Sequence, residues 1–159
     1  MSLLALRLAV EEACAAAPTP AERGRVALAH MDRVESSAPR ACAAGCAFCC
    51  HLPVLVTPSE AAVLAETVAR LPGIRERLRE PRGNRCPLLG DDDRCLAYDA
   101  RPLRCRAHTS PDAAACEREP ESALTLGDPW LRGAAVAIRR AFGEPERGLR
   151  EALRELLGD

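Results

Sequence analysis

Apolar residues recur at helical spacing at the start of the chain. Residues 2–16 place leucine and valine among alanine and charged residues, which predicts an amphipathic helix. A second helix is predicted from residue 19 to about 36. Thr19 and Glu22 have the spacing of a capping box, and Pro20 suits the first helical turn.

The end of the chain has the same periodicity. Asp128 is placed to cap a helix that carries apolar residues at a spacing of four, namely Trp130, Ala134, Ile138 and Phe142. A last helix carries Leu149, Leu153, Leu156 and Leu157. These stripes are expected to form the core.

The middle of the chain is less regular. A short apolar stretch at 52–56 is compatible with an extended segment, and a second capping box, Thr57 to Glu60, opens a helix that ends near Leu71. A short arginine-rich helix is predicted at 74–80. Residues 81–120 are interrupted by proline, glycine and aspartate, and a stretch of that length needs another constraint to be ordered.

These elements predict a mainly α fold with at most a short hairpin. The chain is expected to form one domain, 1–159, built from a helical N-terminal arm (1–38), a cysteine core (40–116) and C-terminal helices (128–157). Aromatic residues make up only 3% of the chain, so a metal staple would help to stabilise its aliphatic core.

The charge and hydropathy of the chain limit the kinds of partner and the cellular compartment that we expect for the protein. The formal net charge is -1, which gives no reason to expect nucleic acid or an acidic membrane surface as a partner. No apolar run is long enough to cross a membrane. The N-terminus lacks the basic segment of a signal peptide, so we expect a cytoplasmic protein, in which nine cysteines favour metal or redox chemistry over disulfides.

Eight of the nine cysteines fall into two groups of four along the chain. They are the predicted metal ligands: Cys42, Cys46, Cys49, Cys50, Cys86, Cys95, Cys105 and Cys116. The C-x-x-C pair Cys46 and Cys49 lets two thiolates reach one metal from a tight turn. The ninth, Cys14, lies in a helical run rich in alanine and is expected to pack in the core.

The number of ligands leaves the arrangement of the site open. Eight thiols suffice for two tetrahedral four-sulfur sites, or for one iron–sulfur cluster with spare thiols. Cys86 and Cys95 flank a Gly-Asp turn, as at the two ends of a hairpin. His51 and His108 each follow a cysteine closely and are alternative ligands. The arginines beside Cys105, at 101, 104 and 106, are candidates for offsetting the charge of the thiolates.

These motifs resemble those of a known family. Together they are similar to the motifs of the YkgJ-like cysteine cluster proteins, a CxxCxxCC family. The motifs that carry the resemblance are Cys46-x-x-Cys49-Cys50 with Thr-Pro-x-Glu after it, Cys86-Pro-Leu-Leu, Cys95-x-x-Tyr98 and Arg101-Pro-x-x-Cys105. The resemblance implies a domain that chelates zinc or iron. The first gap departs from the usual spacing, with three residues between Cys42 and Cys46.

Three functions are therefore weighed. The first is a metal-binding protein with a chelating, structural or accessory role and an unidentified protein partner. The second is an iron–sulfur enzyme or electron-transfer subunit, since flagellin lysine N-methylases share the cysteine pattern; this chain, however, contains no Gly-rich loop for a methyl donor. The third is a thiol-disulfide oxidoreductase using Cys46 and Cys49. No catalytic residue is assigned.

Overall fold

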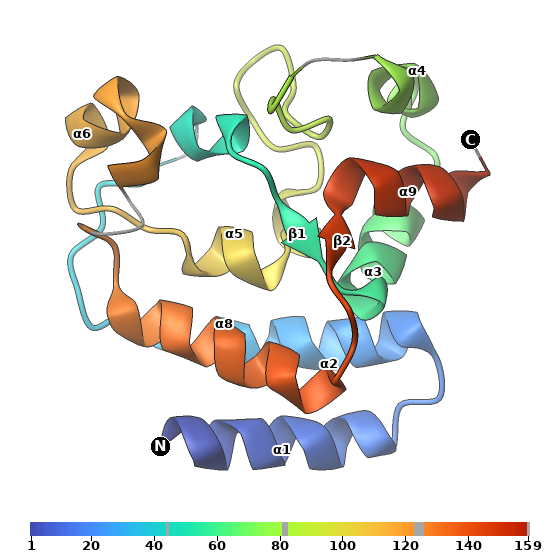
Figure 1. Cartoon of the computed structure of the whole chain (residues 1–159), viewed down its shortest axis with the longest axis vertical. Coiled ribbons are helices and arrows are strands. Elements are labelled where there is room, and N and C mark those ends of the chain that lie inside the picture. The colour runs from blue at the N-terminus through green and yellow to red at the C-terminus, as the bar shows by residue number, and fades with distance from the viewer. Residues whose placement is uncertain (44, 81–82, 123–125, 159) are drawn as a thin grey trace.

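The structure is a computed structural model of residues 1–159 and describes all of them except 44, 81–82, 123–125 and 159. The described part is mainly helical, with one pair of very short strands (Figure 1). This confirms the predicted fold class. No described helix is long and apolar enough to cross a membrane.

Three helices form one side of the molecule. They are α1 (Leu3–Ala15), α2 (Pro20–Asp32) and α8 (Pro129–Phe142), and each packs against the other two (Figure 1). The predicted capping box between Thr19 and Glu22 starts α2, and the predicted cap Asp128 starts α8 by accepting the Trp130 amide.

Helix α3 (Pro58–Val68) joins this layer to the rest of the fold. It packs against α2 on one side and α9 (Leu149–Leu157) on the other. The approach to α2 is very close, because a Cβ atom on Gly24 would lie 2.3 Å from the backbone oxygen of Ser59. The short α4 (Ile74–Arg79) also packs against α9.

The two strands are far apart in sequence. Strand β1 (Leu55–Val56) pairs antiparallel with β2 (Arg147–Gly148), with Leu55 opposite Gly148. The predicted turn between Cys86 and Cys95 is present as an isolated antiparallel bridge from Leu89 to Cys95. Strand pairing therefore fixes the C-terminal helix beside the segment that leaves the first cysteine cluster.

The cysteine-rich segment is more regular than its sequence predicts. The expectation of an irregular stretch over 81–120 holds for 83–97, which contains only turns and an isolated bridge, but not for the rest, which contains η2 (Tyr98–Ala100), α5 (Leu103–Ala107), α6 (Ala113–Arg118) and the first residue of η3 (Pro120–Ser122). A tertiary hydrogen bond starts α5, where the Leu103 amide donates to the Glu60 carboxylate at 2.7 Å. Asp112 caps α6 locally through the Ala115 amide.

Two predicted helices are shorter than expected. Helix α2 ends at Asp32 rather than near Ser36, and α3 ends at Val68 rather than Leu71. Tertiary contacts favour the earlier end of α2, because Ser36 and the next serine donate hydrogen bonds to Asp128 instead of continuing the helix.

The core lies between the helices and consists largely of leucine, valine, isoleucine and alanine. Its most deeply buried side chains include Leu6, Leu64, Leu103, Ile138 and Leu153. The apolar stripe of α8 is confirmed at Ala134 and Ile138, whereas Leu156 on α9 is 52% exposed, so that part of the last predicted stripe is wrong. Two carboxylates, Glu60 and Asp128, are buried within the fold.

Candidate metal centre

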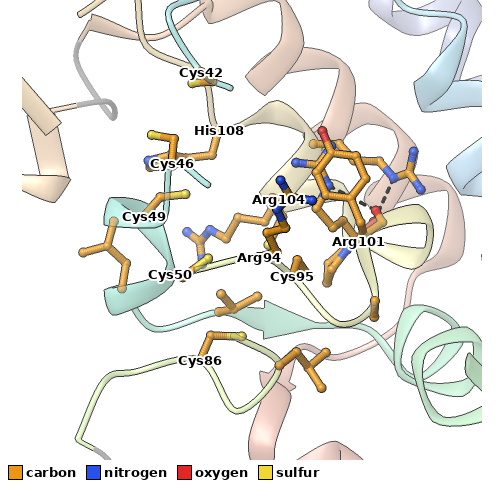
Figure 2. A pocket seen from close by; sticks show the side chains of 18 of the residues that line it. Cys42, Cys46, Cys49, Cys50, Cys86, Arg94, Cys95, Arg101, Arg104 and His108 are labelled. Carbon is orange, nitrogen blue, oxygen red and sulfur yellow. Dashed lines mark hydrogen bonds between the residues drawn. The ribbon is translucent and has the colours of Figure 1, made fainter. Parts of the chain in front are cut away.

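A cavity of about 810 Å³ lies where the two cysteine-bearing segments meet. Seven of the eight predicted ligands line it: Cys42, Cys46, Cys49, Cys50, Cys86, Cys95 and Cys105 (Figure 2). They come from the loop before η1 (Phe48–His51), from η1 itself, from the turn after residue 85 and from α5. Cys116 is buried on α6 and is not among the residues that line the cavity.

Backbone hydrogen bonds hold the two segments together. The Cys86 amide donates to the Cys50 carbonyl at 2.7 Å, and the Ala41 amide donates to the Ser110 carbonyl at 2.8 Å. The Ser110 amide in turn donates to the Cys42 sulfur at 3.3 Å. Cysteines distant in sequence are therefore held close in space before any metal binds.

Four sulfurs that line the cavity influence one another through their charges, and we call them the inner group: Cys49, Cys86, Cys95 and Cys105. Burial raises the pKa of Cys86 to about 11, and the neighbouring thiolates of the group add to this. Burial also raises the pKa of Cys105, with further contributions from the charges of the other three. Burial likewise raises the pKa of Cys95. In the metal-free protein these groups are thiols, and a metal would displace their protons.

Three further cysteines form an outer group, Cys42, Cys46 and Cys116, while Cys50 belongs to neither group and lies next to Cys49 in η1. Burial raises the pKa of Cys46, and the charges of Cys42, Cys49 and Cys116 raise it further. Cys42 is exposed to solvent. The outer group therefore adjoins the inner one through Cys49, and it reaches the surface at Cys42, whereas Cys116 is buried.

The adjacent cysteines of η1 both face the cavity. The Cys49 thiol donates a hydrogen bond to the Cys50 sulfur, and this bond is the main reason that the pKa of Cys49 is raised, followed by burial. Neighbouring residues normally diverge, so the 3-10 turn of η1 allows both sulfurs to reach the same space.

Backbone amides point at three of the sulfurs. In each case the donor lies two residues after the cysteine, as Phe48, Leu88 and Ala97 do for Cys46, Cys86 and Cys95. A hydrogen bond to sulfur favours the thiolate over the thiol and so lowers the pKa against the effect of burial. Such amide donors are the outer-shell contacts that thiolate ligands of a metal require.

Arginines occupy part of the cavity wall. The charge of Arg101 lowers the pKa of Cys49, Cys95 and Cys105, as predicted for a cation beside thiolates. Arg101 also stacks on the Tyr98 ring, 3.8 Å from its centroid. Arg106 lines the cavity too but pairs with Asp32.

The two candidate histidines have different environments. His51 is exposed, whereas His108 lines the cavity and its Nε2 atom is buried without a hydrogen-bond partner in the described structure. Burial lowers the pKa of His108, and the charges of Arg104 and Arg132 lower it further. A neutral imidazole is the form that binds metals. Its position after Cys105 was the signal in the sequence, but the sequence did not distinguish it from His51.

The carboxylate of Glu60 positions the helix that carries Cys105, one member of the inner group. Glu60 is 1% exposed and accepts the Leu103 amide at the start of α5, two residues before Cys105. It also accepts the Thr57 amide at 2.9 Å at the start of α3. One side chain thus fixes the helix that carries Cys105 relative to α3.

Cys14 lies apart from the other cysteines. It is buried on α1 within the hydrophobic core and does not line the cavity. Its sulfur is 4.0 Å from the Arg23 carbonyl oxygen, which it faces as a weak donor.

The donor set matches the chemistry of zinc and iron. Thiolate and imidazole are the ligands of zinc sites, and thiolates are those of iron–sulfur clusters. Within the described residues, no group of three or more Cys, His, Asp or Glu side chains is already placed to hold an ion. The cysteines would therefore have to turn further into the cavity when a metal binds, and the amides around them are in place to stabilise that state.

Comparison with known proteins adds one finding. The family model named CxxCxxCC, described as "Putative zinc- or iron-chelating domain", matches residues 41–123. This range contains all eight clustered cysteines and α6. Comparisons with curated proteins and with solved structures found no match.

Proposed function

This chain belongs to the CxxCxxCC family, and we propose from the description of that family and from the cavity that it is a metal-binding protein, whose central cavity holds zinc or iron on cysteine sulfur. The observation that carries the proposal is the meeting of seven cysteines from two segments at one cavity. All seven are free cysteines, so their sulfurs are available as metal ligands.

We propose all eight clustered cysteines as ligands. The inner group of Cys49, Cys86, Cys95 and Cys105 offers four sulfurs, the number of a closed tetrahedral zinc site or of an iron–sulfur cluster. Cys50 lies beside Cys49 and is available to the same centre. A closed zinc site would stabilise the fold, and a cluster would also carry an electron.

Each part of the chain has a role in this proposal. The amides that donate to sulfur and the charge of Arg101 stabilise the thiolates, as outer-shell groups do. Glu60 holds α5, and with it Cys105, in place. The biological role that follows is chelation, structural support or service to a partner protein, and we place it in the cytoplasm, where thiols stay reduced.

The hydrogen-bonded pair of Cys49 and Cys50 favours a second candidate. Five thiols around one space allow an iron–sulfur cluster with an electron-transfer or enzymatic role. Anaerobic purification followed by metal analysis and absorption spectroscopy separates the two candidates. A broad band near ~400 nm with iron would identify a cluster, whereas a colourless protein with about one or two zinc ions per chain would identify zinc sites. Metal-free protein with a reducible bond between Cys46 and Cys49 would instead point to redox chemistry.

Cysteine variants test the ligand assignment. Cys46→Ser and Cys86→Ser should lose metal and destabilise the fold, because the free energy of metal binding contributes to folding. Cys14→Ser is the matched control, since this thiol is buried in the core away from the cavity, and the variant should retain its metal. Full metal retention in both cavity variants would refute the assignment.

A further inference from the structure

One polar atom at the cavity has no partner. The Nε2 atom of His108 is buried, and the described part of the chain offers it no hydrogen bond. Buried polar groups in folded proteins are nearly always bonded, and leaving one unsatisfied costs about 1–3 kcal/mol. The Nε2 atom is therefore most simply explained as the acceptor site for a group that binds in the cavity.

The position of His108 indicates which group that is. It follows α5 directly, so the helix that supplies Cys105 to the inner group ends in an imidazole. Two residues later, the Ser110 amide donates to the Cys42 sulfur at 3.3 Å. This contact ties the segment of His108 to the start of the first cysteine cluster, and His108 lines the same cavity as Cys42 and Cys46, all three of which are labelled in Figure 2.

We propose that Cys42, Cys46 and His108 are the ligands of a second metal site, distinct from the inner group and suited to zinc, which they would complete by turning toward one another when the ion binds. The inference rests on the proposed metal-binding function and extends it from thiols to a mixed sulfur and nitrogen site. Two thiolates and one imidazole are a ligand set that zinc accepts, and three protein ligands leave a position for water or a further ligand.

Three features separate this site from the inner group. The inner group already contains four sulfurs, enough to close a tetrahedral site without help from His108. The charge of Cys42 acts on Cys46 more strongly than those of Cys49 and Cys116 do, whereas the charges that raise the pKa of Cys105 are those of Cys86, Cys49 and Cys95. Cys42 is also exposed to solvent. The second site is therefore accessible from outside and should exchange its ion faster than the inner one.

The histidine variant His108→Gln tests the site directly, and His51→Gln is the matched control. His51 is also near the cysteines but is exposed and does not line the cavity. Each protein is loaded anaerobically with zinc, freed of excess metal, and analysed for zinc and protein. The wild type and His51→Gln should retain about two ions per chain, and His108→Gln should retain about one.

Cobalt provides a readout that needs no variant at His108. Wild-type protein loaded with Co²⁺ should show hyperfine-shifted imidazole proton resonances, and these should persist in His51→Gln. A chelator added in small steps should remove the ion with the imidazole ligand first, leaving an absorption spectrum typical of sulfur ligands alone.

The outcomes distinguish the two proposals. If the wild type binds metal but shows no imidazole resonance, and His108→Gln keeps the full zinc content, the second site does not exist while the proposed function stands. If the wild type binds no zinc, cobalt or iron, the proposed function itself fails. Loss of one ion and of the imidazole signal together would establish the site.

Discussion

Replacing Glu60 with glutamine should weaken both the fold and the metal centre. The carboxylate is 1% exposed and accepts two backbone amides, Leu103 at 2.7 Å and Thr57 at 2.9 Å. The guanidinium of Arg139 lies 3.6 Å from the same carboxylate. Glutamine has the same shape but carries one acceptor oxygen and one NH₂ group, so an NH₂ donor would face one of the two amide donors.

The expected cost follows from these contacts. Loss of one hydrogen bond to a charged acceptor costs about 1.5–3 kcal/mol, and the amide left unpaired inside the protein adds to this. Arg139 keeps a partner, because Glu146 lies 2.7 Å from it. We therefore expect Glu60→Gln to reduce the free energy of unfolding by about 3 kcal/mol, a large fraction of the ~5–15 kcal/mol typical of a domain.

Urea unfolding of metal-loaded protein measures this change, with equal metal content in every sample because bound metal adds to stability. Glu66→Gln is the matched control. Glu66 lies on the same helix α3 and pairs with Arg25, but its side chain is 54% exposed. Its replacement should cost at most about 0.5 kcal/mol.

A second readout connects Glu60 to the metal. Since its hydrogen bond starts α5 two residues before Cys105, Glu60→Gln should also release metal to a chelator faster than Glu66→Gln does. The reasoning is refuted if the two variants unfold at the same urea concentration and lose metal at the same rate.

Two further predictions concern the fold. Asp128→Asn should destabilise the protein by about 2–3 kcal/mol in thermal or urea unfolding, because the buried carboxylate accepts several hydrogen bonds. Burial raises the pKa of Asp128, but these hydrogen bonds outweigh burial and hold the pKa at about 2, below the ordinary 3.8. The stabilisation by the carboxylate is therefore present above pH 3.8 and is lost as the pH falls toward 2. An acid titration in which wild type and variant lose stability in parallel would contradict this. Gly24→Ala should cost about 1–3 kcal/mol in the same assay because its Cβ would meet the Ser59 backbone at 2.3 Å. Gly133→Ala is the control, since its Cβ would meet only the end of the Leu3 side chain at 2.9 Å; equal effects of the two would argue against rigid packing of α2 on α3.

Local signals in the sequence were sufficient to predict most of the helices. The capping boxes at Thr19 and Thr57 and the cap at Asp128 act within a few residues, and the structure contains all three. The regular apolar spacing of α8 likewise predicts its buried face. Such features depend only on residues that are neighbours in the sequence, so they can be predicted from the sequence without knowledge of the fold.

Short helices in the cysteine region were missed because their stability comes from elsewhere in the chain. Helix α5 has five residues, too few to be stable alone, and its first amide is bonded to Glu60, which lies far away in sequence. The end of α2 was misplaced for a similar reason, since the serines after it bind Asp128. Contacts of this kind have no signature within a local window.

The sequence alone predicts a centre that chelates zinc or iron, because clustered cysteines next to glycine and proline indicate metal binding whatever the fold. It does not predict the arrangement of that centre. Only the tertiary structure brings the turn at Cys86 against η1. Only it leaves the Nε2 atom of His108 buried and, among the described residues, without a hydrogen-bond partner, while His51 is exposed. Which residues share one space depends on long-range packing and on a few buried hydrogen bonds, and these exist only once the chain has folded.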